Sequence, residues 1–106
     1  MIVFLLSSTI VPSAAPESVA VTAVSSYGVD IKWSPPSSPN GIIVLYTVYI
    51  NSSTVIRVNG SSTHYFLEGL LPYQQISVSV SASTMIGEGP RSEEKVVRTH
   101  QAGTHV

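Results

Sequence analysis

Apolar and polar residues alternate with a period of two along most of this 106-residue chain, and no window shows convincing helical periodicity. The clearest case is residues 75–83, where apolar positions 76, 78, 80 and 82 alternate with Gln75 and four serines. This pattern is typical of a strand in a sheet with one buried and one solvated face. We therefore expect a strand over residues 75–83.

Shorter alternations predict six further strands, separated by turn-forming sequences. Residues 35–41 contain three prolines, which cannot donate backbone hydrogen bonds to a sheet, and residues 87–90 read Gly-Glu-Gly-Pro. Seven short strands with turns roughly every 10 residues predict an all-β fold, a seven-stranded antiparallel β-sandwich. The six further strands are expected at residues 19–23, 29–34, 43–50, 54–58, 65–67 and 96–99.

Several short motifs follow one another in a characteristic order. They are Pro16, Ile31-Lys32-Trp33 with Pro35-Pro36, Asn40-Gly41-Ile42, Tyr46-Thr47-Val48-Tyr49, Gly69-Leu70-Leu71-Pro72-Tyr73, Val78-Ser79-Val80-Ser81-Ala82 and Gly87-Glu88-Gly89-Pro90. In this order and at this spacing, residues 16–99 resemble a fibronectin type III domain. The resemblance implies an immunoglobulin-like sandwich, in which the first, second and fifth strands face the third, fourth, sixth and seventh.

The resemblance also implies which side chains form the core. Trp33 and Tyr46 are expected at its centre, and the period-two alternation of their strands agrees with this placement. The residues expected in the core are Ile31, Trp33, Tyr46, Val48, Leu67, Leu70, Val78 and Val80.

One position departs from the pattern of the family. The family usually has a tyrosine four residues after the Pro of its Leu-x-Pro turn, and the hydroxyl of this tyrosine bonds to the backbone there. Counting from Pro72 places Ile76 at that position, and Ile76 cannot make a hydrogen bond worth about 0.5–1.5 kcal/mol. Tyr73 lies three residues too early and on the opposite face of the strand. We therefore expect a folded domain of below-average stability.

The two ends of the chain are expected to lie outside the domain. Residues 1–15 combine an apolar run with a Pro-Ser-Ala-Ala sequence, but no Lys or Arg precedes the run. The run is also shorter than the about 20 residues that span a bilayer, so we expect no transmembrane segment. We interpret residues 1–15 as a leader, a linker or a truncated signal-like segment, residues 16–99 as the domain, and residues 100–106 as a flexible tail.

The composition excludes several functions. Five Lys and Arg against six Asp and Glu give a net charge of −1, so the chain lacks the basic surface that nucleic acids require. The absence of cysteine excludes disulfides, cysteine–zinc sites and thiol catalysis. Asp30 and His64 are expected on an outer face, without the buried pocket and oxyanion donors of acyl transfer. We expect no catalytic residue, no cofactor and no metal site.

Two asparagines are candidates for N-glycosylation. Asn51-Ser52-Ser53 and Asn59-Gly60-Ser61 both satisfy the acceptor pattern, and both fall at predicted turns. The alternative is that they are simply turn residues, since Asn-Gly is a common hairpin sequence.

Three residues of the third predicted strand are candidates for an interaction surface. If Tyr46 and Val48 face the core, then Ile43, Leu45 and Tyr49 face outward. They are either ordinary scattered surface residues or a patch for a neighbouring domain or a protein ligand.

We therefore expect a non-catalytic extracellular module, a spacer and adhesion unit of a larger membrane-anchored or secreted protein. Its loops resemble those in tandem arrays of receptor-type tyrosine phosphatases and related adhesion proteins. The integrin-binding Arg-Gly-Asp of some family members does not occur in this sequence. Two alternatives stay open, because a fold does not determine a function: an intracellular scaffold module of a giant muscle-type protein, or an accessory module of a secreted enzyme.

Overall fold

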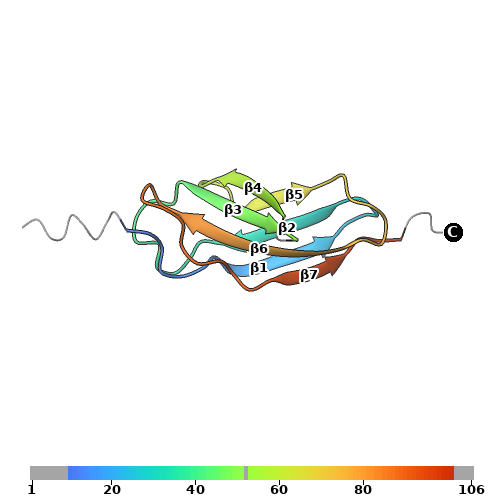
Figure 1. The fold of residues 1–106 in the computed structure, drawn as a ribbon, viewed down its shortest axis with the longest axis horizontal. Helices are drawn as coiled ribbons and strands as arrows, with labels where there is room; N and C mark the ends of the chain where they lie inside the picture. Colours follow the sequence, from blue (N-terminus) through green and yellow to red (C-terminus); the bar gives the residue numbers. More distant parts are fainter. Residues whose placement is uncertain (1–9, 52, 102–106) are drawn as a thin grey trace, which may run out of the picture.

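The computed structural model describes residues 10–51 and 53–101, and these residues form seven β-strands (Figure 1). The predicted seven-stranded fold is confirmed, and the alternation at residues 75–83 matches one strand at both ends. The third strand begins two residues later than expected, because the loop before it continues to residue 44. The strands are β1 (Glu17–Ala23), β2 (Val29–Ser34), β3 (Leu45–Ile50), β4 (Thr54–Asn59), β5 (His64–Leu67), β6 (Gln75–Ser83) and β7 (Lys95–Arg98).

The strands form two antiparallel sheets, divided as the family resemblance implies. One sheet has the order β1-β2-β5 and the other the order β4-β3-β6-β7. Strands β4 and β5 lie along one edge of the sandwich, and β1 and β7 lie along the opposite edge (Figure 1). Strands β2, β3 and β6 are therefore central, and they supply the fully buried hydrophobic side chains.

The core lies between the sheets, with an aromatic pair at its centre. Trp33 of β2 and Tyr46 of β3 are buried, with ring centroids 5.3 Å apart and planes tilted by 59°. Leu67 and Leu70 are only partly buried, since β5 is an edge strand and Leu70 follows it in a loop. The fully buried core residues are Val29, Ile31, Trp33, Tyr46, Val48, Ile50, Ile76, Val78, Val80 and Ala82.

Residues 10–16 contact one end of the sandwich. The Ser13 amide donates to the carbonyl of Ser38 over 3.1 Å, and the Pro12 side chain is fully buried. The domain boundary at residue 16 stays a prediction. Residues 1–9 of the predicted leader and residues 102–106 of the predicted tail lie outside the described residues.

The turn between β5 and β6 is held by a threonine in place of the tyrosine that is usual in the family. Thr99 is buried directly after β7, and its hydroxyl donates to the carbonyl of Leu71 and accepts from the amide of Gln74, each over 2.7 Å. Ile76 is buried in the core, whereas Tyr73 is exposed. The expectation of below-average stability depended on a missing hydroxyl contact, and Thr99 supplies such a contact from the position directly after β7. The expectation itself stays a prediction.

Replacing Thr99 with valine tests this role, because valine keeps the shape of the side chain and removes its hydroxyl. The change leaves the Gln74 amide and the Leu71 carbonyl without their partner, so we expect the free energy of unfolding to fall by about 1–3 kcal/mol. Urea denaturation, monitored by tryptophan fluorescence, measures this decrease in unfolding free energy. The T99S variant retains the hydroxyl and should lose clearly less. A loss in T99S that exceeds the loss in T99V would mean that methyl packing, and not the hydroxyl, holds the turn.

Candidate interaction surfaces

Four side chains from distant parts of the chain meet on the outer face of the four-stranded sheet. The hydroxyls of Tyr49 (β3) and Ser81 (β6) both donate to one carboxylate oxygen of Glu88, in the loop before β7. The Arg91 guanidinium lies 3.6 Å from the centroid of the Tyr49 ring, in a cation–π contact. We call these four residues the Tyr49–Glu88 cluster.

The backbone of the β6–β7 loop places Glu88 at this face. The amide of Gly89 donates to the carbonyl of Ala82 over 2.9 Å, and the amide of Ser92 donates to the carbonyl of Val80 over 2.8 Å. The loop therefore runs back along β6 before β7 begins, and the Glu88 side chain reaches β3. Tyr49 and Glu88 lie 39 positions apart, so no local sequence pattern connects them.

The electrostatics of the cluster favour a charged Glu88 and a neutral Tyr49. Hydrogen bonds from Ser81 and Tyr49, with a smaller contribution from Arg91, hold the pKa of the Glu88 carboxyl below its ordinary value. Burial, reinforced by the hydrogen bond to Glu88, raises the pKa of the Tyr49 hydroxyl. The carboxylate and the two hydroxyls therefore form a stable acceptor–donor set at neutral pH.

The predicted patch of Ile43, Leu45 and Tyr49 is only partly an outer surface. Ile43 packs against the core, because it precedes β3 and the strand alternation does not extend to it. Leu45 and Tyr49 are half-buried on the outer face, and Arg91 covers the Tyr49 ring. Val55 of β4, directly opposite Tyr49, is exposed, and only the strand pairing reveals this neighbour.

Both candidate glycosylation residues are exposed at the ends of β4. The Asn51 side-chain oxygen accepts from the amide of Ser77 over 2.9 Å, and that of Asn59 accepts from the amide and hydroxyl of Ser61 over 2.9 and 2.8 Å. The contacts of both side chains with described residues therefore use the side-chain oxygen, whereas a glycan would be carried by the amide nitrogen. Asn59 pairs with Leu45 across the strands, so the two share one face.

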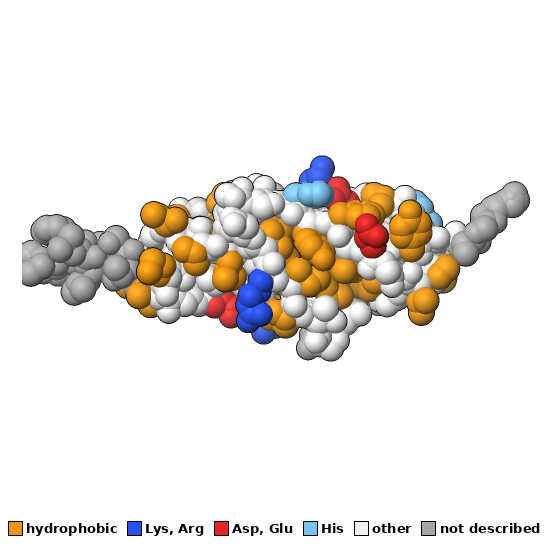
Figure 2. Space-filling model, turned by 90° about the horizontal axis from the view of Figure 1, so that it is seen from above, with side chains coloured by type: hydrophobic (Ala, Val, Ile, Leu, Met, Phe, Trp, Pro, Cys, Tyr) orange, Lys and Arg blue, Asp and Glu red, His pale blue; other side chains and the backbone are white. Residues whose placement is uncertain are grey.

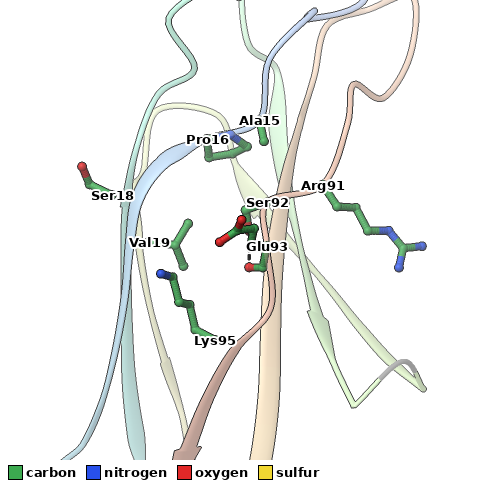
Figure 3. A pocket seen from close by; sticks show the side chains of 8 residues that line it. All are labelled: Ala15, Pro16, Ser18, Val19, Arg91, Ser92, Glu93 and Lys95. Carbon is green, nitrogen blue, oxygen red and sulfur yellow. Dashed lines mark hydrogen bonds between the residues drawn. The ribbon is translucent and has the colours of Figure 1, made fainter.

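A groove of about 370 Å³ lies on the edge of the sandwich where β1 and the segment before β7 approach each other (Figure 3). The side chains in the groove carry charges of both signs, from Glu93 and Lys95, whereas Arg91 points away from it (Figure 3). The groove is open to solvent. Its lining residues are Ala15, Pro16, Ser18, Val19, Arg91, Ser92, Glu93 and Lys95.

Asp30 and His64 are neighbours on the outer face of the three-stranded sheet. The His64 imidazole contacts the Asp30 carboxylate, and the Lys32 ammonium lies 3.8 Å from the same carboxylate. Over residues 10–51 and 53–101, no group of three or more His, Cys, Asp or Glu side chains is placed to hold a metal ion. The same described residues include no helix with the length and apolar character needed to cross a membrane.

A two-layer antiparallel sandwich with long loops at both ends and polar clusters on its outer faces is the architecture of an immunoglobulin-like module. Comparison with known proteins narrows this class to one family. Residues 14–98 match the sequence model described as "Fibronectin type III domain". The chain therefore belongs to the fibronectin type III family.

The relatives that the chain matches are much longer proteins. The chain is 39% identical over 92 residues to "Phosphatidylinositol phosphatase PTPRQ" of Rattus norvegicus. This match covers 85% of this chain and 4% of that protein. The chain is 33% identical over 86 residues to "Cell adhesion molecule Dscam2" of Drosophila melanogaster, 74% of this chain and 4% of that protein. The solved fibronectin type III domain of human contactin 1 has a TM-score of 0.80 at 26% identity, over 92% of this chain and 87% of that one.

The Tyr49–Glu88 cluster predicts how stability depends on pH. Because folding lowers the pKa of Glu88, the charged carboxylate stabilises the folded state above its ordinary pKa of 4.5, and this contribution is lost as the pH falls through the folded value. We expect the difference in unfolding free energy between the native chain and E88Q to be largest near neutral pH. It should shrink below pH 4.5, as denaturant titrations at several pH values would measure.

The E68Q variant controls for the general loss of a negative charge, because Glu68 is an exposed glutamate in the loop after β5. A pH-independent difference between the native chain and E88Q would contradict a stabilising role for the carboxylate.

Proposed function

We propose that this chain is a non-catalytic extracellular module, which acts as a spacer and protein-interaction unit in a longer membrane-anchored or secreted protein. The observation that carries the proposal is the sequence match to two much longer proteins. The matched segment covers only 4% of the length of each. One of these relatives is named a phosphatase and the other a cell adhesion molecule. In such a protein, any catalytic activity would belong to another domain, and this module would contribute spacing and surface contacts.

The two alternatives make different demands on the surface. An intracellular scaffold module, as in giant muscle proteins, would leave the acceptor sequences at Asn51 and Asn59 unused. An accessory module of a secreted enzyme would require a flanking catalytic domain. Asn51, in the turn before β4, and Asn59, its last residue, are both exposed, which is what glycosylation in an extracellular location requires.

Within this function, we propose the outer face around Leu45 and Tyr49 as a contact surface for a neighbouring domain or a protein ligand. Val55, opposite Tyr49, extends its apolar area, and Arg91 adds a stacked charge. Aromatic and arginine side chains are enriched where proteins bind one another. A glycan on Asn59 would lie beside Leu45 and cover part of this surface, so glycosylation and binding at this face compete.

Glycosylation is tested best by changing the third residue of each acceptor sequence. Asn51 has a φ of 53°, in the left-handed region that asparagine tolerates, and its side chain bonds to Ser77, so replacing it would strain the turn. The S53A and S61A variants remove the acceptor patterns and keep both asparagines. Expressed in its parent protein in secretory cells, the native module should run on a gel as a large species that N-glycan removal shifts. Each variant should carry one glycan fewer, so that glycan removal changes its gel mobility by a smaller amount.

A large band that glycan removal does not move would favour the intracellular scaffold. If an antibody to this domain detected the endogenous protein only near 11 kDa, the mass of this chain alone, the proposal of a module in a longer protein would be contradicted.

The contact surface is tested by the double variant L45S/Y49S. We expect it to reduce association of the parent protein, measured by sedimentation at several concentrations, because it removes the apolar area that binding would bury. The Y49F variant keeps the ring and removes only the hydroxyl bond to Glu88, so it should associate normally. Both belong in an S61A background, where no glycan shields Leu45. Unchanged association and solubility of the double variant would contradict the proposed surface.

A further inference from the structure

All three arginines of the chain lie on the outer face of the four-stranded sheet. Arg57 of β4 and Arg98 of β7 are exposed and follow partly buried residues in their strands, and Arg91 covers the Tyr49 ring on the same face. The outward-facing positions of the four strands include no Asp or Glu. The loop before β7 brings one carboxylate to this face, that of Glu88. Positive charge therefore predominates here, although the chain as a whole has a net charge of −1.

Two of these arginines flank one row of residues across the sheet. Arg57 pairs with Thr47 of β3, and Thr47 pairs with Ser81 of β6. On the far side of β6, the amide of Ser92 donates to the β6 backbone over 2.8 Å, which places the neighbouring Arg91 beside this row. The backbones of Arg57 and Arg91 are therefore separated by three strand spacings of about 4.8 Å each.

The guanidinium groups of Arg57 and Arg91 have no ion-pair or hydrogen-bond partner among residues 10–51 and 53–101. The ion pairs in this part of the chain are both made by Asp30, on the other sheet. Its hydrogen bonds from arginine side chains both come from Arg98. The N–H donors of Arg57 and Arg91 are therefore available to a ligand.

Glu88 does not occupy these donors. Hydrogen bonds from Ser81 and Tyr49 are the main causes of the lowered pKa of its carboxyl, and Arg91 and Arg57 contribute less. The carboxylate is therefore within electrostatic range of both guanidinium groups, but it is held by hydroxyls and forms an ion pair with neither.

Apolar side chains lie among the arginines. Leu45 and Tyr49 are half-buried on this face, and Val55 and Val96 are exposed on it. In Figure 2, charged side chains are few and hydrophobic ones lie around them. The Arg91 guanidinium is already stacked 3.6 Å from the centroid of the Tyr49 ring, so less of its conformational freedom remains to be lost on binding.

We infer that this face binds an acidic surface of a different protein, whose carboxylates pair with Arg57 and Arg91 while its apolar side chains cover Leu45 and Val55. The inference depends on the contact surface proposed above and names the chemistry of its partner. A guanidinium group can donate two parallel hydrogen bonds to one carboxylate, so a pair of carboxylates satisfies both arginines. Arginine mixed with aromatic and aliphatic side chains favours a protein over a polyanion, because nucleic acids bind denser basic patches.

The test measures binding of this chain, made without glycans, to an extended peptide that contains Glu and Leu. We expect the backbone amide signals of β3, β4 and residues 88–92 to shift in NMR titrations, and the affinity to fall at high salt. R57Q and R91Q should each weaken binding by about three- to fivefold, the size of an exposed ion pair, and the double variant by about tenfold or more. K32Q is the matched control, because it removes an exposed positive charge from the other sheet. It should bind like the native chain.

Charge reversal separates ion pairing from the loss of a side chain. R57E should bind the acidic peptide more weakly than R57Q does, because it places a like charge opposite the ligand. It should bind a matched peptide, in which Lys replaces every Glu, more tightly than the native chain does.

Four outcomes would overturn the inference. The native chain could bind neither peptide, or both equally, or K32Q could lose as much affinity as R57Q. Tighter binding of a heparin fragment, with the same dependence on both arginines, would assign the face to a sulfated polysaccharide. Self-association of the chain alone that R57Q/R91Q abolishes would assign it to a second copy.

Failure here is distinguishable from failure of the proposed function. If L45S/Y49S reduces association of the parent protein and R57Q/R91Q leaves it unchanged, the contact surface stands and only its acidic partner is refuted. If neither double variant changes association, the contact surface itself is refuted. The glycan-removal experiment decides the extracellular location independently of both results.

Discussion

The packing of Trp33 against Tyr46 is the contact on which the remaining structure depends. The two rings come from different sheets and meet at 5.3 Å between centroids, surrounded by aliphatic side chains of β2, β3 and β6. The chain has no cysteine, so side-chain burial, and no covalent bridge, holds the sheets together. Large aromatic side chains bury more apolar area than any aliphatic residue, which makes this pair the natural centre of a small core.

With the interior occupied by packing, hydrogen bonds at the periphery position the loops. Thr99 ties the β5–β6 turn to the end of β7, and Glu88 ties the β6–β7 loop to β3. Each uses a hydroxyl or carboxylate that belongs to a different element from its partners. The loops at both ends are therefore ordered by the sandwich, and their exposed side chains are presented in defined positions.

Function in such a molecule is confined to its surfaces. The outer face around Leu45 and the two ends of the sandwich are separate surfaces. The face neighbours a candidate glycan site at Asn59, whereas at one end of the sandwich the Thr84 hydroxyl donates to the carbonyl of Ile10.

The sequence by itself determined the strands, because period-two alternation is a local property that each strand displays whatever its neighbours are. The division into two sheets and the centre of the core were implied only by the resemblance to the family. Tertiary structure alone decided which residues complete the turns and cover the faces. Thr99 replaces a tyrosine from 28 positions beyond Leu71, and Glu88 meets Tyr49 across 39 positions. Ile43 turned inward because the loop before β3 ended later than its alternation suggested. Such contacts depend on how loops return to the sheets, and no local pattern in the chain records that path.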